Sequence, residues 1–421
     1  MTALGRVCGR RLVVAFAVVV ALASVAPAAG AARAAKRFAG IVPDVRTGAS
    51  IRAPAVAHAA DLPYGGGEVL HWNRTHVIFW QPTGSTLTFD PGYASLIETF
   101  LSQVADDSHM TTNVYALTGQ YTDPLGTATY DSVYGGAVVA TDPLPANGCT
   151  EPPQAGPGWT VCLTDQQLED ELGHVIAVDH LPQGNDDIYF LVTPDGLGDC
   201  EFAGPADCAL GGDTDGSYCG YHSSTAGGVL YAVIPYNAIP GHCQSGNPRP
   251  NASTADPALS TISHEQSETI TDPLGDAWID SAQDEVGDLC ITSYGTPLGA
   301  TAAGAFNELI GGGRYYLQEE WSNAQFSCQP RARPDSVSFS APRQVARDRP
   351  VSLTARAGDP NGKIVAYDWF YGDTRIGHGR RVTHAYKRAG LYRIVLRTTD
   401  SWGNWGFFAR QLIVTSPVPA T

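Results

Sequence analysis

The sequence predicts two folded parts, an α/β or α+β domain over residues 61–330 and an all-β, immunoglobulin-like sandwich over residues 334–416. In the first part, β-branched and aromatic runs alternate with segments of helical periodicity. In the second, short alternating apolar runs recur every eight to twelve residues between turn residues. Charge divides the chain at the same place: residues 61–330 carry 35 Asp and Glu against 3 Arg, whereas residues 331–421 carry 15 Lys and Arg against 6 acids.

The first domain opens with a strand, a helix and a second strand. Residues 75–80 alternate as a strand, residues 93–104 carry apolar side chains at helical spacing, and residues 113–118 resume the strand pattern. The elements predicted to follow are a capped amphipathic helix, two buried strands and a last helix, over 164–177, 187–192, 229–234 and 257–271. The last helix starts from Asp256-Pro257 and stops before Pro273, which cannot continue it.

The N-terminus predicts export. Arg6, Arg10 and Arg11 precede an apolar run over 12–25 and an Ala-Pro-Ala cleavage site, so residues 1–28 are predicted to be a secretory signal peptide. The apolar run is short for a membrane span, and no later segment is long and apolar enough to be one. We therefore expect a secreted, extracellular protein whose mature chain has no membrane span. Residues 29–60 are predicted to be a linker or a short propeptide.

The cysteines agree with an oxidising compartment. Eight lie in the first domain, an even number that predicts four disulfides. Sequential pairing closes short loops and is our expectation: Cys149 with Cys162, Cys200 with Cys208, Cys219 with Cys243, and Cys290 with Cys328. A thiolate zinc site is the disfavoured alternative, because no paired C-x-x-C spacings occur.

The helix over 257–271 contains the strongest catalytic pattern, His264-Glu265-Gln266-Ser267-Glu268. In the zincin pattern H-E-x-x-H, two zinc ligands four residues apart share a helix face, and the Glu beside the first is a general base. Here a carboxylate, which zinc also accepts, replaces the second His. The pattern predicts a zincin-like domain in which His264 and Glu268 bind zinc and Glu265 polarises a bound water. The alternative is a solvated helix with these residues at chance spacing.

The third zinc ligand is left between two candidates. Asp272 is four residues past Glu268, but eight residues of straight helix rise about 12 Å. It therefore reaches the metal only if the chain turns sharply before Pro273. The other source is the carboxylate-rich segment over 276–288, in which Glu285 is preferred because a downstream Glu completes many helix-based zinc sites. Asp272 is slightly favoured.

The sandwich carries several ordered motifs, among them Asp-Pro-Asn-Gly at 359–362, Tyr-Asp-Trp-Phe-Tyr-Gly-Asp at 367–373, His384-Ala385-Tyr386 and Asp-Ser-Trp-Gly at 400–403. This region resembles polycystic-kidney-disease-type (PKD) domains, which implies an accessory module for spacing or binding. Thr374 stands where such domains usually have Gly, and His384 is interpreted as structural. The basic charge suits an anionic wall polymer or the acidic neighbouring domain, although a solvated basic face is the simpler interpretation.

The first domain has a second resemblance. Its ordered segments are His-Val-Ile-Phe-Trp at 76–80, Asn-Val-Tyr at 113–115, the run ending Cys219-Gly220-Tyr221-His222, Thr-Asp-Pro at 271–273 and Ala-Trp-Ile-Asp at 277–280. Together they resemble the bacterial branch of the phosphate-induced (EXORDIUM-like) secreted protein family. The resemblance implies an exported, disulfide-bonded, wall-associated protein.

Two further groups of residues each have a structural and a functional interpretation. His222 lies three residues after Cys219, and a structural histidine beside a disulfide is favoured over a ligand or proton donor. Asp213-x-Asp215-Gly216 resembles part of a calcium loop. An EF-hand is excluded because no acid stands at the twelfth position, which leaves a simple calcium turn.

These patterns predict a secreted zinc-dependent hydrolase, a peptidase acting on peptides or proteins, with an accessory module. The alternative is a non-catalytic extracellular or wall-associated binding protein on a degenerate zincin scaffold. The acidic domain argues against nucleic acid as a partner. No G-x-S-x-G elbow, P-loop or dinucleotide fingerprint occurs, so serine hydrolases and nucleotide enzymes are disfavoured.

Overall fold

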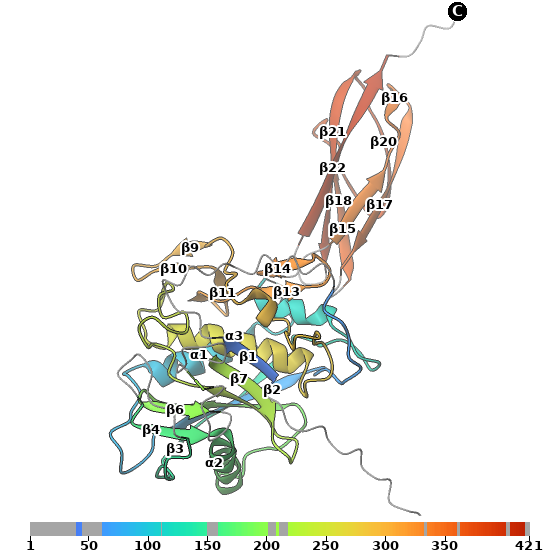
Figure 1. Cartoon of the computed structure of the whole chain (residues 1–421). Helices are drawn as coiled ribbons and strands as arrows, with labels where there is room; N and C mark the ends of the chain where they lie inside the picture. Colours follow the sequence, from blue (N-terminus) through green and yellow to red (C-terminus); the bar gives the residue numbers. More distant parts are fainter. Residues whose placement is uncertain are drawn as a thin grey trace, which may run out of the picture. The chain divides into compact units, whose positions relative to one another are not determined.

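A computed structural model describes most of the chain (Figure 1). The described residues are 39–43 (backbone only), 61–110, 112–149, 159–200, 208–209, 218–331, 335–359, 363–400 and 405–416. The predicted signal peptide and the Asp213–Gly216 turn lie outside them. Among the helices of the described residues, none has the length and hydropathy needed to cross a membrane.

A six-stranded mixed sheet forms the centre of the first domain. In order, its strands are β1 (Ala39–Pro43), β7 (Tyr218–Ser224), β8 (Leu230–Ile234), β5 (Asp187–Val192), β2 (Asn73–Trp80) and β3 (Ser132–Ala140). The four strands from β8 to β3 are parallel. Strand β7 is antiparallel to β8, and β1 is antiparallel to β7. The part of the predicted linker or propeptide that the structure describes is thus an edge strand of this sheet.

Helices cover both faces of the sheet. Alternate residues of β5 divide between two cores, Ile188 and Phe190 on one side and Tyr189 and Leu191 on the other. The first core contains residues of α1 (Tyr93–Asp106) and α3 (Asp256–Thr271), and the second contains residues of α2 (Asp165–Val178). A strand that is buried on both faces reads as a continuous apolar run, as β5 does. The arrangement is the α/β alternative of the predicted fold class.

The prediction of a strand over 113–118 is wrong. Residues Val114–Gln120 form a 3-10 helix, η1, in which Val114 to Gly119 are buried without interruption. A strand with one solvated face would alternate, and this segment does not. Its β-branched and aromatic residues indicated a strand, but packing inside the core decides the conformation.

Smaller elements surround the sheet. Strands β4 (Val161–Thr164) and β6 (Leu197–Cys200) pair in parallel, and the short helix η2 (Asp288–Cys290) follows the loop after α3. Three hairpin-like pairs come after it: β9 (Gly299–Ala300) with β10 (Ala305–Phe306), β11 (Glu308–Ile310) with β12 (Gly313–Tyr315), and β13 (Glu320–Ser322) with β14 (Ser327–Gln329).

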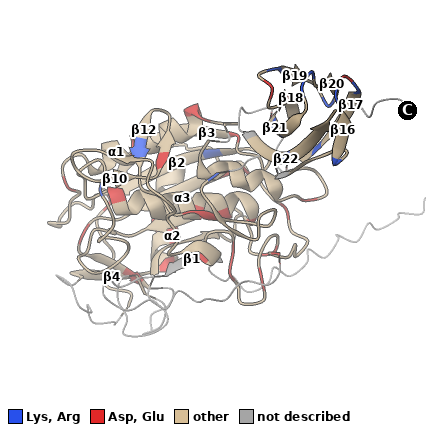
Figure 2. Ribbon diagram, turned by 90° about the horizontal axis from the view of Figure 1, so that it is seen from above, with Lys and Arg blue, Asp and Glu red and all other residues tan. Residues whose placement is uncertain are grey.

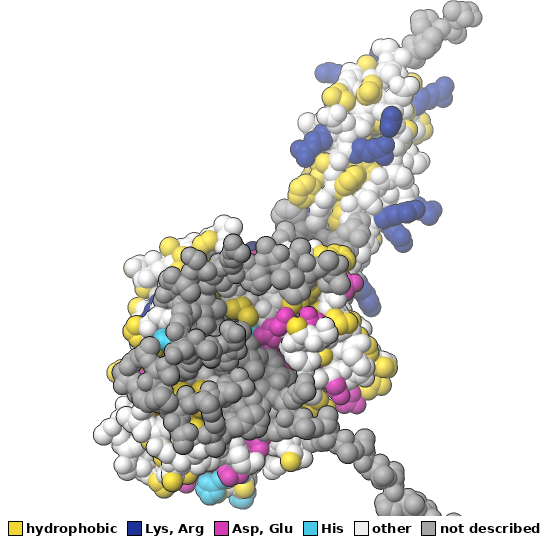
Figure 3. Space-filling view, in the orientation of Figure 1, with side chains coloured by type: hydrophobic (Ala, Val, Ile, Leu, Met, Phe, Trp, Pro, Cys, Tyr) yellow, Lys and Arg dark blue, Asp and Glu magenta, His cyan; other side chains and the backbone are white. Residues whose placement is uncertain are grey.

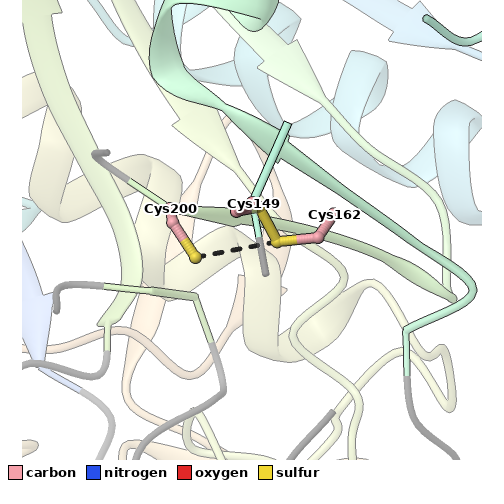
Figure 4. Close-up of side chains that lie close together, drawn as sticks. All are labelled: Cys149, Cys162 and Cys200. Carbon is pink, nitrogen blue, oxygen red and sulfur yellow. Dashed lines mark hydrogen bonds between the residues drawn. A yellow bond between two sulfur atoms is a disulfide. The ribbon is translucent and has the colours of Figure 1, made fainter. Parts of the chain in front are cut away.

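All four sequential disulfides are confirmed: Cys149–Cys162, Cys200–Cys208, Cys219–Cys243 and Cys290–Cys328. The first two lie side by side, with the sulfurs of Cys162 and Cys200 3.7 Å apart (Figure 4). Because these cysteines are paired with one another, the thiolate zinc site stays disfavoured.

The C-terminal part is a β-sandwich. One sheet has the order β15 (Asp335–Ser340), β17 (Pro350–Gly358), β20 (Arg381–Ala385). The other has the order β16 (Gln344–Ala346), β22 (Trp405–Thr415), β21 (Gly390–Asp400), β18 (Ile364–Phe370), β19 (Ile376–His378). Trp369 is fully buried between them and donates from Nε1 to the backbone oxygen of Gly379 at 2.9 Å. The predicted sandwich is confirmed.

The two kinds of charge separate as the sequence indicates. Lys and Arg side chains are distributed over the strands of the sandwich, whereas most of the charged residues seen in the α/β domain are Asp and Glu (Figures 2 and 3). His384 is structural in its contacts: its ring stacks on Tyr371 with centroids 4.0 Å apart, and its Nε2 lies 2.8 Å from Oδ2 of Asp373.

Thr374 stands where PKD domains usually have Gly, and its backbone conformation is strained. Its φ of 72° lies in the left-handed region, where a residue with a Cβ costs roughly 1–2 kcal/mol. Replacing it with Gly relieves this strain, partly offset by the greater freedom of Gly in the unfolded chain. We expect Thr374→Gly to stabilise the sandwich by about 0.5–1 kcal/mol, measured as a higher midpoint of its unfolding transition in denaturant. A lower midpoint would contradict this interpretation.

Candidate metal centre

Helix α3 carries the predicted site, and all sixteen of its residues are buried. The helix packs against β7 and β8 on one side and against η1 on another. Its start is held by Asp256, whose Oδ1 accepts from Nδ2 of Asn251 at 2.7 Å. The alternative of a solvated helix is therefore wrong. The side chains of His264, Glu265 and Glu268 are 0% exposed.

Two histidines lie among the carboxylates. His264 Nε2 is 3.0 Å from Oε1 of Glu268 and 3.5 Å from Oδ1 of Asp288. His222, from β7, has Nδ1 3.2 Å from Oε2 of Glu265 and 3.7 Å from Oε2 of Glu268. Its Nε2 lies 3.8 Å from Oε2 of Glu285. Glu268 thus lies between two imidazoles, one from its own helix and one from the sheet.

The loop after α3 brings Glu285 and Asp288 to this place. The backbone N–H groups of Gly287 and Asp288 both donate to Oε1 of Glu268, at 3.0 and 3.1 Å. The N–H of Glu285 donates to Oδ2 of Asp288 at 3.0 Å. These bonds fold the loop against the helix. They leave Oε2 of Glu268 and both carboxylate oxygens of Glu285 buried without a hydrogen-bond partner in the described structure.

Apart from Cys149, Cys162 and Cys200, whose sulfurs form disulfides, two groups of side chains in the described residues are compact enough to hold a metal ion. One is His222, Glu268 and Glu285, and the other is His264, Glu268 and Asp288. Within each group, the candidate ligand atoms all lie within 4.8 Å of one another. Three of the predicted site residues, His264, Glu268 and Glu285, therefore meet here, and Glu265 lies beside them.

Asp272 is in neither group. The chain does turn sharply at this residue, but Oδ1 of Asp272 is used to hold the turn. It accepts from the backbone N–H groups of Asp276 and Ala277, both at 2.7 Å. The backbone oxygen of Asp272 lies 3.3 Å from Nε2 of His222. Between the two candidates for a third ligand, the structure brings Glu285 and not Asp272 into a compact group.

His222 is the functional candidate that sequence reasoning undervalued. It follows the Cys219–Cys243 disulfide, but its ring faces three glutamates of α3 and the following loop. The residues that meet it lie 43 to 63 positions later in the chain, as the numbering of Glu265 and Glu285 shows. No spacing rule connects a strand residue to a helix so far along the chain. The position of His222 on a predicted buried strand could nevertheless have made it a stronger functional candidate.

Burial and mutual repulsion shift the pKa values of this cluster. Burial, and then the charges of Asp272 and Glu268, raise the pKa of Glu285 well above its usual range. Burial raises the pKa of Asp272 to about 7 and that of Asp288 to about 6, and it lowers the pKa of His222 to about 4. Burial alone would lower the pKa of His264, but the charge of Glu268 outweighs it and raises that pKa. In this buried cluster, it is therefore more favourable for the carboxylates to bind protons or a cation than to remain ionised without a partner.

The arginines of the first domain are engaged elsewhere. Arg74 pairs with Asp187 at 3.0 Å, Arg249 donates to the backbone oxygen of Ser245 at 3.1 Å, and Arg314 lies over the ring of Phe306. Residues 61–330 contain no other Arg and no Lys. The basic side chains that this stretch places among the carboxylates are His222 and His264.

Comparison with known proteins bears on the C-terminal part. Residues 331–406 match the family model described as the PKD domain. The PKD1 domain of Vibrio anguillarum Epp is 26% identical; the match covers 20% of this chain and 96% of that chain, with a TM-score of 0.18. The PKD1 domain from the Vibrio cholerae metalloprotease PrtV is 25% identical, with coverages of 19% and 95% and a TM-score of 0.18. A structure of carbohydrate-binding modules from the β-sandwich superfamily is 32% identical, with coverages of 20% and 35% and a TM-score of 0.19.

Proposed function

Because residues 331–406 form a PKD domain, a module often present in secreted enzymes and binding proteins, we propose that this chain is a secreted zinc-dependent hydrolase with an accessory module. The observation that supports this proposal is the buried cluster on α3. Two imidazoles and several carboxylates approach one another there, and some carboxylate oxygens have no hydrogen-bond partner in the described structure. An unpaired buried carboxylate is costly, and a bound cation removes that cost.

The donor set fits zinc. Imidazole nitrogen and carboxylate oxygen are both zinc ligands, and His264, His222, Glu268, Glu285 and Asp288 offer them within the two compact groups. Zinc in such a site polarises a carbonyl and brings the pKa of a bound water to about 7. Glu268 is held by two backbone N–H groups, so its position is fixed before any ion binds.

Glu265 is suited to move a proton. It belongs to neither compact group, yet its Oε2 lies 3.2 Å from Nδ1 of His222. Neighbouring positions on a helix point about 100° apart, so His264 and Glu265 cannot both address an ion in the same way. We assign Glu265 the role of general base, which would accept the proton of the attacking water.

The substrate class rests on the helix pattern. His-Glu-x-x-Glu resembles the peptidase pattern, so we propose peptides or proteins as substrates. The PKD domain, with 15 basic residues against 6 acids over 331–421, would bind an anionic wall polymer or space the α/β domain from a surface. The resemblance of residues 70–330 to the EXORDIUM-like family, and the wall association that it implies, also remain predictions.

The first test is metal content together with hydrolysis. We expect the purified full-length protein to contain stoichiometric zinc and to cleave fluorescent casein or a peptide library. Dialysis against a chelator should remove both properties, and added zinc should restore both. A protein purified from zinc-containing medium that holds no stoichiometric metal would refute the proposal.

A non-catalytic binding protein is the second candidate, and one observation favours it. The α3 side chains of the cluster, His264, Glu265 and Glu268, are 0% exposed, and so is His222, whereas a catalytic site needs a path for its substrate. In that case, the metal would act as a structural brace and the domain would bind a partner through another surface. Zinc that raises the thermal midpoint of the α/β domain in a protein that cleaves nothing would support this alternative.

A further inference from the structure

We propose that strand β1 occupies the place where an extended peptide substrate binds, so that residues 39–43 inhibit the site in the full-length chain. The inference rests on the proposed function and deepens it, because it names the form in which a substrate is recognised and the segment that keeps it out. The position of β1, the neighbours of the strand with which it pairs and the charge of its segment all point to this role.

Strand β1 lies beside the strand that carries His222 (Figure 1). It pairs antiparallel with β7, with Ala39 opposite His222 and Val42 opposite Gly220. The other edge of β7 is already taken by β8, so β1 fills the one main-chain edge that this strand still offers. An extended peptide recognises a sheet through such an edge, by the same kind of main-chain hydrogen bonds. The position of β1 is therefore the one that a peptide would take on β7.

This part of β7 adjoins the proposed general base. Gly220 packs so closely against α3 that a Cβ there would lie 3.2 Å from Oε1 of Glu265. His222 stands two residues further along the same strand, and its Nδ1 is 3.2 Å from Oε2 of Glu265. Strand β1 itself lies against α3 and η2, the two elements that supply Glu268 and Asp288. A peptide paired with β7 in place of β1 would therefore run past Glu265 and the cluster.

The place of β1 accounts for a catalytic cluster that is closed to solvent. The side chains of His222 and of the α3 residues of the cluster are 0% exposed while β1 is paired with β7. Departure of β1 would free the edge of β7 and open the side of the cluster at which a peptide arrives. The activity expected of the full-length protein is then that of the fraction of molecules in which β1 has left the sheet.

The segment that contains β1 has the charge needed to hold it against the α/β domain. Residues 29–60 carry one acid, Asp44, and five basic side chains: Arg33, Lys36, Arg37, Arg46 and Arg52. Residues 61–330 carry 35 acids against 3 Arg. Opposite net charges attract, and the covalent connection keeps the effective concentration of β1 at β7 high. This bias toward basic residues favours a segment that binds its own domain over a plain linker.

Proline substitutions in the full-length protein test whether β1 blocks the site. Ile41→Pro together with Val42→Pro removes two successive main-chain N–H groups, one of which faces β7. We expect the amides of β7 to lose protection from hydrogen exchange. We also expect kcat/KM on a peptide library to rise at least about tenfold, since a site that is free in fewer than about a tenth of the molecules binds that much more weakly. Ala57→Pro, in the same segment but outside β1, is the matched control and should change neither quantity. Faster exchange of β7 without a gain in hydrolysis, in a protein that already cleaves peptides, would overturn the inference and leave the proposed function intact.

Binding of a separate peptide decides the matter even if the protein cleaves nothing. A specific protease site inserted after Gly48 allows the segment to be cut from the folded, full-length protein and removed by gel filtration. A labelled peptide of residues 37–45 should then bind the cut protein, bind the uncut protein far more weakly, and be displaced by peptide substrates, whereas a scrambled peptide should not bind. Peptide binding without hydrolysis would support the place of β1 and count against the proposed function. Equal binding to cut and uncut protein, or binding to neither, would overturn the inference.

Discussion

Glu265→Gln should abolish peptide hydrolysis while leaving zinc stoichiometric. The amide has nearly the shape of the carboxylate but cannot accept a proton from water, and loss of a general base typically costs about 10²- to 10⁴-fold in rate. Glu265 lies in neither compact ligand group, so the metal should stay. The measurement is kcat on a casein or peptide-library substrate, together with zinc content, for variant and wild type.

Glu171→Gln is the matched control. Glu171 lies on α2, against the opposite face of the sheet, and burial raises the pKa of its carboxyl to about 7. The same chemical change made there should leave both zinc and hydrolysis at wild-type levels. If Glu265→Gln cleaves the substrate as fast as wild type, its role as the base is excluded.

Reduction of the disulfides should unfold the α/β domain and spare the PKD domain. The four bridges lie within residues 149–328, and each typically contributes roughly 2–4 kcal/mol. Together they match or exceed the net stability of about 5–15 kcal/mol that is usual for a domain. The sequence after residue 330 has no cysteine. Calorimetry should therefore show two thermal transitions, of which only one moves to lower temperature with reductant.

The control for this prediction is the same scan after the reductant has been removed and the disulfides have re-formed. The displaced transition should return, while the other should stay in place throughout. Equal displacement of both transitions by the reductant would show that the chain does not divide into these two domains.

Local rules predicted the elements that depend on local sequence. The Asp-Pro start and the Pro stop set the limits of α3, and the capping box of Thr164 and Gln167 starts α2 where expected. Alternation predicted an all-β sandwich over residues 334–416, although it did not identify the short strands β16 and β19. Sequential disulfides were predictable because short loops bring their cysteines together.

Long-range contacts were not predictable in the same way. The approach of His222 to Glu265, Glu268 and Glu285 depends on how β7 lies against α3, and no pattern in a single sequence records that packing. The role of Asp272 could be determined only from the observed turn. Its carboxylate, which could have reached an ion, instead accepts hydrogen bonds from two backbone N–H groups. Glu285 was identified by analogy alone, and the folding of its loop onto Glu268 explains why it meets the cluster.

Strand β1, which precedes the rest of the α/β domain in the sequence, pairs with the strand that carries His222. Ala39 pairs opposite His222 and Val42 opposite Gly220, so residues far ahead of the α/β domain complete the sheet beside the cluster. A chain cut after residue 43 would leave β7 as the last strand, with its main-chain donors and acceptors unpaired. An extended peptide can pair with such a strand edge.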